Sequence, residues 1–191
     1  MGTIGKLDIQ KIVSEMDSKI DYNIQLYLVG SVSSIVGYGL EKATLDVDSF
    51  ESLEKRIITD WNKACDKLNI DLKLNHSAVF YPPDQFTDRY KKSDISTKMV
   101  SVYFMEKHDF VISKLARGWG KDIDDIVSLH KKSPLDAQRL IDIFFDEYIF
   151  VQAVGHLPDH IITLKEIIFE LFGEKELTHR AADIDRRFNR K

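Results

Sequence analysis

The chain has 191 residues, of which 43% are hydrophobic and 30% charged, and its net charge is −4. This composition is typical of an ordinary globular protein and argues against a uniformly basic nucleic-acid binder. No apolar run approaches the roughly 20 residues that span a bilayer, so no membrane contact is predicted. The single cysteine, Cys65, excludes an internal disulfide, and acids among the first apolar residues argue against a signal peptide. We therefore expect a cytoplasmic protein.

Hydrophobic periodicity predicts the elements of the first half. Apolar residues three or four apart predict helices over residues 6–20 and 52–68. The pattern of residues 31–39 is ambiguous, but small residues followed by glycines suit a short helix that starts right after Gly30. Alternating or short apolar runs predict strands over residues 24–29, 44–50, 70–74 and 99–105. The polar stretch 84–97 is expected to be a loop.

From residue 107 onward the pattern is helical, in about five pieces. Ser133-Pro134-Leu135-Asp136 predicts a helix start, with the serine as N-cap and the proline in the first turn. The order of elements indicates an α+β fold, a small mixed sheet flanked by helices with a helical C-terminal half. We expect a catalytic-type domain over 1–130 and a helical extension over 131–191 packed on it.

Asp46-Val47-Asp48 is the most informative motif of the chain. Alternate residues of a strand point to the same face, so Asp46 and Asp48 are expected side by side with Val47 turned into the core. Two such carboxylates suit Mg²⁺, which prefers hard oxygen ligands and shares them with substrate phosphates. The plainer interpretation is a pair of solvated carboxylates, although aspartate is disfavoured within strands.

Gly30-Ser31 follows the apolar run Ile24–Val29 and precedes the acid pair. A glycine at a strand end is commonly turn chemistry alone. Combined with a following helix, it predicts a helix N-terminus aimed at an anion, with bare backbone where a phosphate can approach. A strand, a glycine turn, a helix and a second strand with metal ligands together favour phosphoryl or nucleotidyl transfer.

This pattern resembles the minimal nucleotidyltransferase superfamily, which has the polymerase-beta-like fold. The Lys42-x-Thr44-x-Asp46-x-Asp48 version is similar to a toxin-type, AbiEii-like branch. The segment from Asp109 to Asp125, with Lys114-Leu-Ala and Lys121-Asp122, is similar to a downstream block of that branch.

The resemblance implies a role for each matching residue. Gly30 and Ser31, helped by Lys42 and Thr44, would bind the triphosphate of an NTP. Asp46 and Asp48 would bind Mg²⁺ (or Mn²⁺). The remaining implied site residues are Lys114, contacting phosphate or the reacting centre, and Asp122, joined by Asp125. Lys114 also has a plainer interpretation, a helix lysine whose amine reaches water, and the two aspartates can simply complement a helix dipole.

A third carboxylate of a full polymerase-type site is not evident, and Asp71 and Glu106 are the alternatives. The function expected from the resemblance is transfer of an NMP to RNA, such as tRNA, or to a protein, by a toxin with a cognate antitoxin or by a phage-defence protein. The basic residues of the middle loop would then meet RNA phosphates: Arg89, Lys91, Lys92 and Lys98. The alternative is a catalytically degenerate binding or regulatory module with the same fold.

Overall fold

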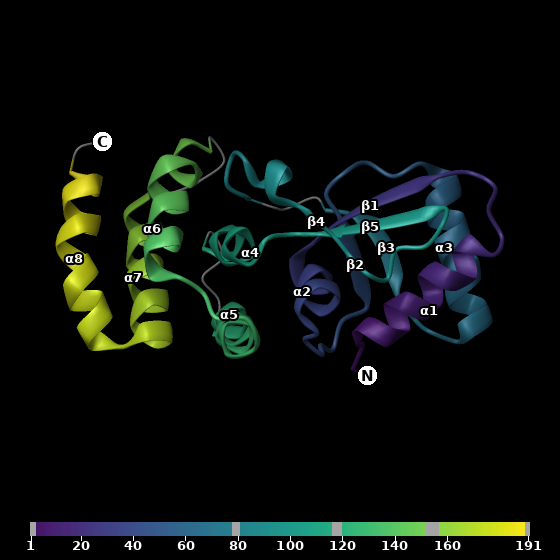
Figure 1. Cartoon of the computed structure of the whole chain (residues 1–191), viewed down its shortest axis with the longest axis horizontal. Helices are drawn as coiled ribbons and strands as arrows, with labels where there is room; N and C mark the ends of the chain where they lie inside the picture. The colour runs from purple at the N-terminus through teal and green to yellow at the C-terminus, as the bar shows by residue number, and fades with distance from the viewer. Residues whose placement is uncertain (1–2, 78–80, 116–119, 152–156, 190–191) are drawn as a thin grey trace. The chain divides into compact units, whose positions relative to one another are not determined.

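The computed structural model describes residues 3–77, 81–115, 120–151 and 157–189. The chain divides into two units. The sheet unit comprises Met1–Phe80 and Asp88–Glu106, and the helical unit comprises Tyr81–Thr87 and Lys107–Lys191. The fold is α+β, as the order of elements predicted (Figure 1).

The sheet unit contains one five-stranded mixed sheet with the order β3-β2-β1-β5-β4. Its strands are β1 (Ile24–Val29), β2 (Asp46–Ser49), β3 (Lys73–His76), β4 (Lys91–Lys92) and β5 (Val100–Phe104). β1 pairs in parallel with β5, and β2 in parallel with β3. The β1–β2 and β4–β5 pairs are antiparallel.

One face of the sheet forms the core of this unit. Side chains from the inner positions of the strands, such as Leu26, Val47 and Val102, are fully buried together. They pack with apolar residues of three helices, α1 (Lys6–Asp17), α2 (Gly30–Tyr38) and α3 (Lys55–Leu68). Trp61 of α3 is buried, as its spacing predicted, and its indole N–H donates to the carbonyl of Leu72 at 2.8 Å.

The opposite face carries the alternate residues of the same strands, since strand side chains point to the two faces in turn. We call this the polar face. Its half-buried or exposed members are Gln25, Tyr27, Asp46, Asp48, Lys73, Asn75, Lys92, Ser101 and Tyr103. The acid pair of the sequence motif therefore lies on the side of the sheet away from the core.

The helical unit contains five α-helices among its described residues, in agreement with the predicted number. They are α4 (Lys107–Lys114), α5 (Gly120–Lys132), α6 (Ala137–Asp146), α7 (Leu157–Phe172) and α8 (Glu174–Phe188). Two short 3-10 helices are η1 (Phe86–Arg89) and η2 (Tyr148–Phe150). Phe110, Phe144 and Tyr148 are among its fully buried side chains. In the described part of the chain, no helix has the length and apolar character needed to cross a membrane.

The structure corrects three predicted details. The third strand covers 73–76 rather than 70–74, because the Leu72 carbonyl accepts hydrogen bonds from Trp61 and Cys65 of α3. The predicted loop 84–97 contains η1 and the strand β4, whose two lysines give no apolar alternation.

The third correction concerns the start of α6. Its N-cap is Asp136, whose carboxylate accepts from the Arg139 N–H at 2.7 Å, and not Ser133. The Ser133 N–H instead donates to Leu129 at the end of α5. The functional division at residue 130 stays a prediction.

Candidate functional site

Asp46 and Asp48 lie on the strand β2 with the alternation that the motif predicts. Asp46 is exposed, Asp48 is half-buried, and Val47 between them is fully buried in the core. The two carboxylates therefore extend from the same face of the sheet, because residues two apart in a strand share a face. Their oxygens are of the hard type that Mg²⁺ prefers.

The glycine turn lies next to Asp48. The antiparallel register of β1 and β2 pairs Val29 with Asp48, and α2 begins at the following residue, Gly30. Gly30 has φ +60°, in the left-handed region that favours glycine. A Cβ at this position would lie 3.4 Å from Oδ2 of Asp48. The bare backbone that the sequence predicted at Gly30 is therefore immediately beside one acid of the pair.

Thr44 and Asn75 both form hydrogen bonds with Asp46, the first residue of the acid strand. The Asp46 N–H donates to Oγ1 of Thr44 at 3.3 Å, and the Thr44 hydroxyl lies 3.1 Å from the Asp46 carbonyl, to which it donates. On the neighbouring strand β3, Asn75 is the register partner of Asp48, and its Nδ2 donates to Oδ1 of Asp46 at 2.9 Å. Asn75 thus contacts one acid of the pair and stands opposite the other.

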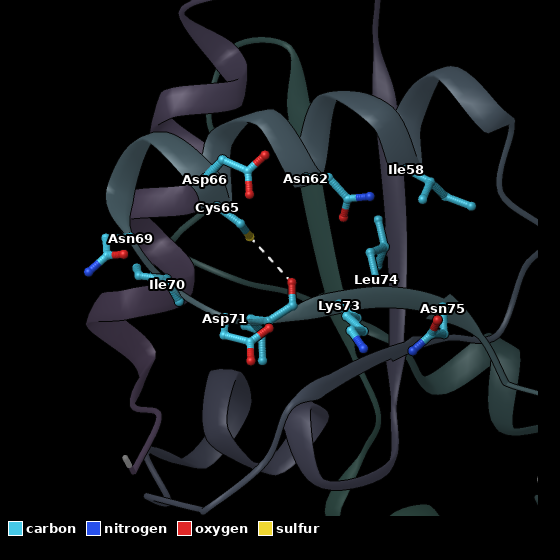
Figure 2. A pocket seen from close by; sticks show the side chains of 11 residues that line it. Ile58, Asn62, Cys65, Asp66, Asn69, Ile70, Asp71, Lys73, Leu74 and Asn75 are labelled. Atoms are coloured by element: carbon cyan, nitrogen blue, oxygen red, sulfur yellow. Dashed lines mark hydrogen bonds between the residues drawn. The ribbon is translucent and has the colours of Figure 1, made fainter. Parts of the chain in front are cut away.

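A groove of about 600 Å³ lies between α3 and β3. Figure 2 shows Leu74 pointing toward α3, whereas Lys73 and Asn75 extend from the other side of the strand. The lining is mostly polar and includes Asp71 and Asn75. Two of its lining residues, Lys73 and Asn75, also belong to the polar face, whereas Asp46 and Asp48 do not line it.

Neither alternative for the third carboxylate occupies the position beside Asp48. Asp71 lies two residues before β3 and is exposed, and Glu106 follows β5 and is buried. The residue opposite Asp48 on the neighbouring strand is the amide Asn75. Sequence reasoning missed Asn75 because the predicted third strand, 70–74, ended one residue before it.

The other predicted site residues belong to the helical unit. Lys114, at the end of α4, is 3% exposed, and its Nζ lies 2.6 Å from Oδ1 of Asp122 and 3.1 Å from Oδ2 of Asp125, both on α5. Nζ also lies 5.0 Å from the centre of the Phe110 ring. This cluster joins α4 to α5. The part of the downstream block at 116–119, including Arg117, lies outside the described residues.

Lys42, the remaining predicted phosphate contact, is half-buried in the sheet unit. It lies in an isolated antiparallel bridge with Ile4, and its backbone both accepts from and donates to Ile4. The backbone contact places Lys42 at the beginning of the segment that leads through Thr44 into β2.

The two carboxylates of β2 are of the type that binds Mg²⁺ together with phosphates. Within the residues that the structure describes, no group of three or more histidines, cysteines, aspartates or glutamates could hold a metal ion. Mg²⁺ keeps several waters and is commonly bound by one or two carboxylates together with substrate phosphates. Asp46 and Asp48 are two carboxylates on one face of β2, and Gly30 lies beside Asp48.

The α+β fold, the glycine turn and the Asp-x-Asp strand next to it are those expected of a nucleotidyltransferase. A family model described as a nucleotidyltransferase of unknown function, DUF6036, matches residues 7–156. This match covers most of the chain, and the chain belongs to that family. The family implies an NTP as substrate. No curated protein and no solved structure matches the chain significantly.

Proposed function

We propose that the protein transfers an NMP from an NTP to an acceptor hydroxyl, with Asp46 and Asp48 as the metal-binding acids. The observation that carries the proposal is the position of Gly30, whose backbone lies beside Oδ2 of Asp48 at the start of α2. A helix N-terminus presents unsatisfied N–H groups to an anion, and the two acids beside it would hold a metal ion that accompanies the phosphates.

The reaction balances without a further reagent. The acceptor oxygen forms a bond to the α-phosphorus, the bond between the α-phosphorus and the bridging oxygen breaks, pyrophosphate leaves, and the hydroxyl proton passes to solvent. Asp46 and Asp48 would hold Mg²⁺, which when bound would neutralise the charge that develops on the phosphates. The protein's part is to position the phosphates at Gly30 and Ser31 and to hold the acids, with Asn75 orienting Asp46 and Thr44 bonded to its backbone.

The finer assignments rest on the resemblance. By similarity to the toxin-type, AbiEii-like branch, the acceptor is RNA, such as tRNA, or a protein, and the protein acts as a toxin with a cognate antitoxin. The resemblance also implies a domain over 1–130 extended by the helices of 131–191, with Lys114 and Asp122 among its functional residues. The ion pair of Lys114 with Asp122 and Asp125 supports at least a structural role for these residues.

Label transfer tests the proposal directly. Each α-labelled NTP is incubated with total RNA and with cell protein in the presence of Mg²⁺ or Mn²⁺, using the wild type and Asp48→Ala. We expect one nucleotide to label one acceptor class with the wild type only. A wild type that transfers no label under any of these conditions would refute the enzymatic proposal.

Asn75 favours a second candidate function, a binding module of the same fold that holds a nucleotide without transferring it. With the neutral amide of Asn75 opposite Asp48, β2 and its register partners on β3 supply two carboxylates for a metal. Titration calorimetry distinguishes a protein that binds NTP, as both candidate functions require, from one that does not. Metal-dependent NTP binding that Asp46→Ala abolishes, without label transfer, supports the binding module.

A further inference from the structure

The polar face also carries a cluster of aromatic side chains. The proposed chemistry does not use this cluster. Tyr27 of β1 and Tyr103 of β5 stack with their ring centres 4.8 Å apart and their planes 9° from parallel. The ring of Tyr90 contacts Tyr27 edge-on, with a centre-to-centre distance of 5.2 Å. All three tyrosines are half-buried, so their rings are partly accessible from this side of the sheet.

Positive charge adjoins these rings at the edge of the sheet. β4 consists of Lys91 and Lys92, both exposed, and its register pairs Lys92 with Tyr103. Paired residues of antiparallel strands share a face, so Lys92 extends from the polar face. In the strand order β1-β5-β4, Tyr103 has Tyr27 on one side and Lys92 on the other.

The tyrosines are continuous with the acid pair. Tyr27 is two residues before Val29, the register partner of Asp48, which corresponds to about 7 Å along the strand. Tyr27 therefore lies one step of this length from the level of Asp48, and Asp46 lies two residues farther along β2, on the side away from Tyr27. Across the polar face, Lys92 of β4 is followed by the stacked tyrosines of β5 and β1 and then by the acids of β2.

We propose that the polar face binds a single-stranded RNA acceptor, with a base stacked on the Tyr27–Tyr103 pair and a phosphate at Lys92. This inference rests on the proposed nucleotidyl transfer, because it names the acceptor of the same site. Aromatic side chains on which bases stack, together with positively charged side chains that meet the phosphates, are the general means of binding single-stranded nucleic acid. An acceptor protein would need no flat stacking surface, so the observations favour RNA.

Burial raises the pKa of the Tyr27 phenol, and the nearby carboxylate of Glu51 raises this pKa further. The Tyr27 phenol therefore stays neutral, and its O–H donates to Oε1 of Gln25 at 3.0 Å. A neutral ring is what base stacking requires, whereas a phenolate would repel the phosphates.

Fluorescence anisotropy with a labelled single-stranded RNA of mixed sequence tests this inference on the full chain without NTP. Loss of a stacked base weakens binding about fivefold to a hundredfold, so we expect this range for Tyr103→Leu. Tyr103→Phe keeps the ring and should bind like the wild type. Lys92→Ala should reduce the slope of log affinity against log salt by about one. Phe150→Ala, which removes an aromatic side chain that is 60% exposed in the helical unit, is the matched control.

The remaining outcomes each decide the inference. Equal RNA affinity for Tyr103→Leu and wild type overturns it, and so does wild type that binds no RNA. If Tyr103→Leu loses Mn²⁺-dependent NTP binding but keeps RNA binding, the rings hold the base of the NTP and the inference is wrong. Label transfer to protein by a wild type that binds no RNA would leave the nucleotidyltransferase proposal standing and identify a protein acceptor.

Discussion

The two units hold their carboxylates in opposite environments. In the sheet unit, Asp46 is exposed and accepts a hydrogen bond from the neutral amide of Asn75. In the helical unit, Asp122 is 2% exposed and lies 2.6 Å from the ammonium of Lys114. The same residue type therefore offers negative charge to a ligand in one unit and balances an internal cation in the other. Membership of a sequence motif does not distinguish these roles, because burial and the neighbouring charge decide them.

The largest expected effect is on the helical unit, where Lys114→Ala removes the cation from two carboxylates. Breaking a buried ion pair costs about 3–5 kcal/mol, because the remaining charge stays buried without compensation. Asp46→Ala, at an exposed position, should change the free energy of unfolding by less than about 0.5 kcal/mol. Unfolding in guanidinium chloride measures both values, with Lys131→Ala on the exposed side of α5 as control. A loss of unfolding free energy below about 1 kcal/mol in Lys114→Ala would mean that the carboxylates of the two units do not differ in this way. Lys114 would then be available to a ligand.

Gly30→Ala tests whether the turn beside Asp48 needs a bare backbone. A side chain at φ +60° costs about 1–2 kcal/mol, and the new Cβ would lie 3.4 Å from Oδ2 of Asp48. We expect this loss of stability together with weaker Mn²⁺-dependent NTP binding, measured by calorimetry. Gly120→Ala is the matched control, since a Cβ there meets nothing within 4 Å. Unchanged nucleotide binding in a folded Gly30→Ala protein would contradict the role proposed for the turn.

The sequence predicted most of the sheet unit, because its strands follow simple alternation and its glycine turn has a specific backbone requirement. The apolar run before Gly30 and the inward Val47 between two acids need no knowledge of distant residues. The strand β4 was not predictable in this way. Its two lysines have no apolar partner in sequence, and pairing with β5 alone defines them as a strand.

The candidate site was less predictable than the fold. Asn75 enters the site through the register of β3 with β2, which is set by bonds from α3 to the Leu72 carbonyl and by the Lys73 N–H donating to Leu45. These are contacts between segments far apart in the chain. The stacked pair Tyr27 and Tyr103 similarly depends on the parallel pairing of β1 with β5. A single sequence carries no local signal of either arrangement.

Asn75→Asp sharpens the contrast by adding a third carboxylate to the polar face. A further negative charge a few ångströms from Asp48 attracts a divalent cation, and we expect Mn²⁺ affinity to rise by roughly tenfold. Electron paramagnetic resonance of free Mn²⁺ measures this binding in the absence of nucleotide. Asn62→Asp, which adds the same charge to the α3 side of the neighbouring groove, is the control. Equal affinities for both variants would indicate that the register position of Asn75 has no special relation to the metal.

The smallest expected effect concerns His130 of the helical unit. It tests whether the two units also differ in how they respond to pH. Burial, and to a lesser degree Lys107, lowers the pKa of His130 below 6.5. Its Nδ1 accepts from the Leu135 N–H at 3.1 Å, and its ring contacts Phe172. The unfolded chain therefore binds the proton more readily. The contribution of His130 to the stability of the folded state is present above pH 6.5 and is lost as the pH falls from 6.5 through the folded-state pKa.

His130→Asn keeps an acceptor near Nδ1 but removes the titration, so the free energy of unfolding should lose part of its pH dependence below 6.5. The cost at neutral pH should not exceed that of one neutral hydrogen bond, about 1 kcal/mol. Unfolding curves at several pH values measure this dependence, and His179→Asn on the exposed side of α8 is the control. The acid pair on β2 carries no histidine in its strand, so its metal affinity should be the same in His130→Asn and wild type. A change in that affinity would mean that protonation of the helical unit influences the acid pair.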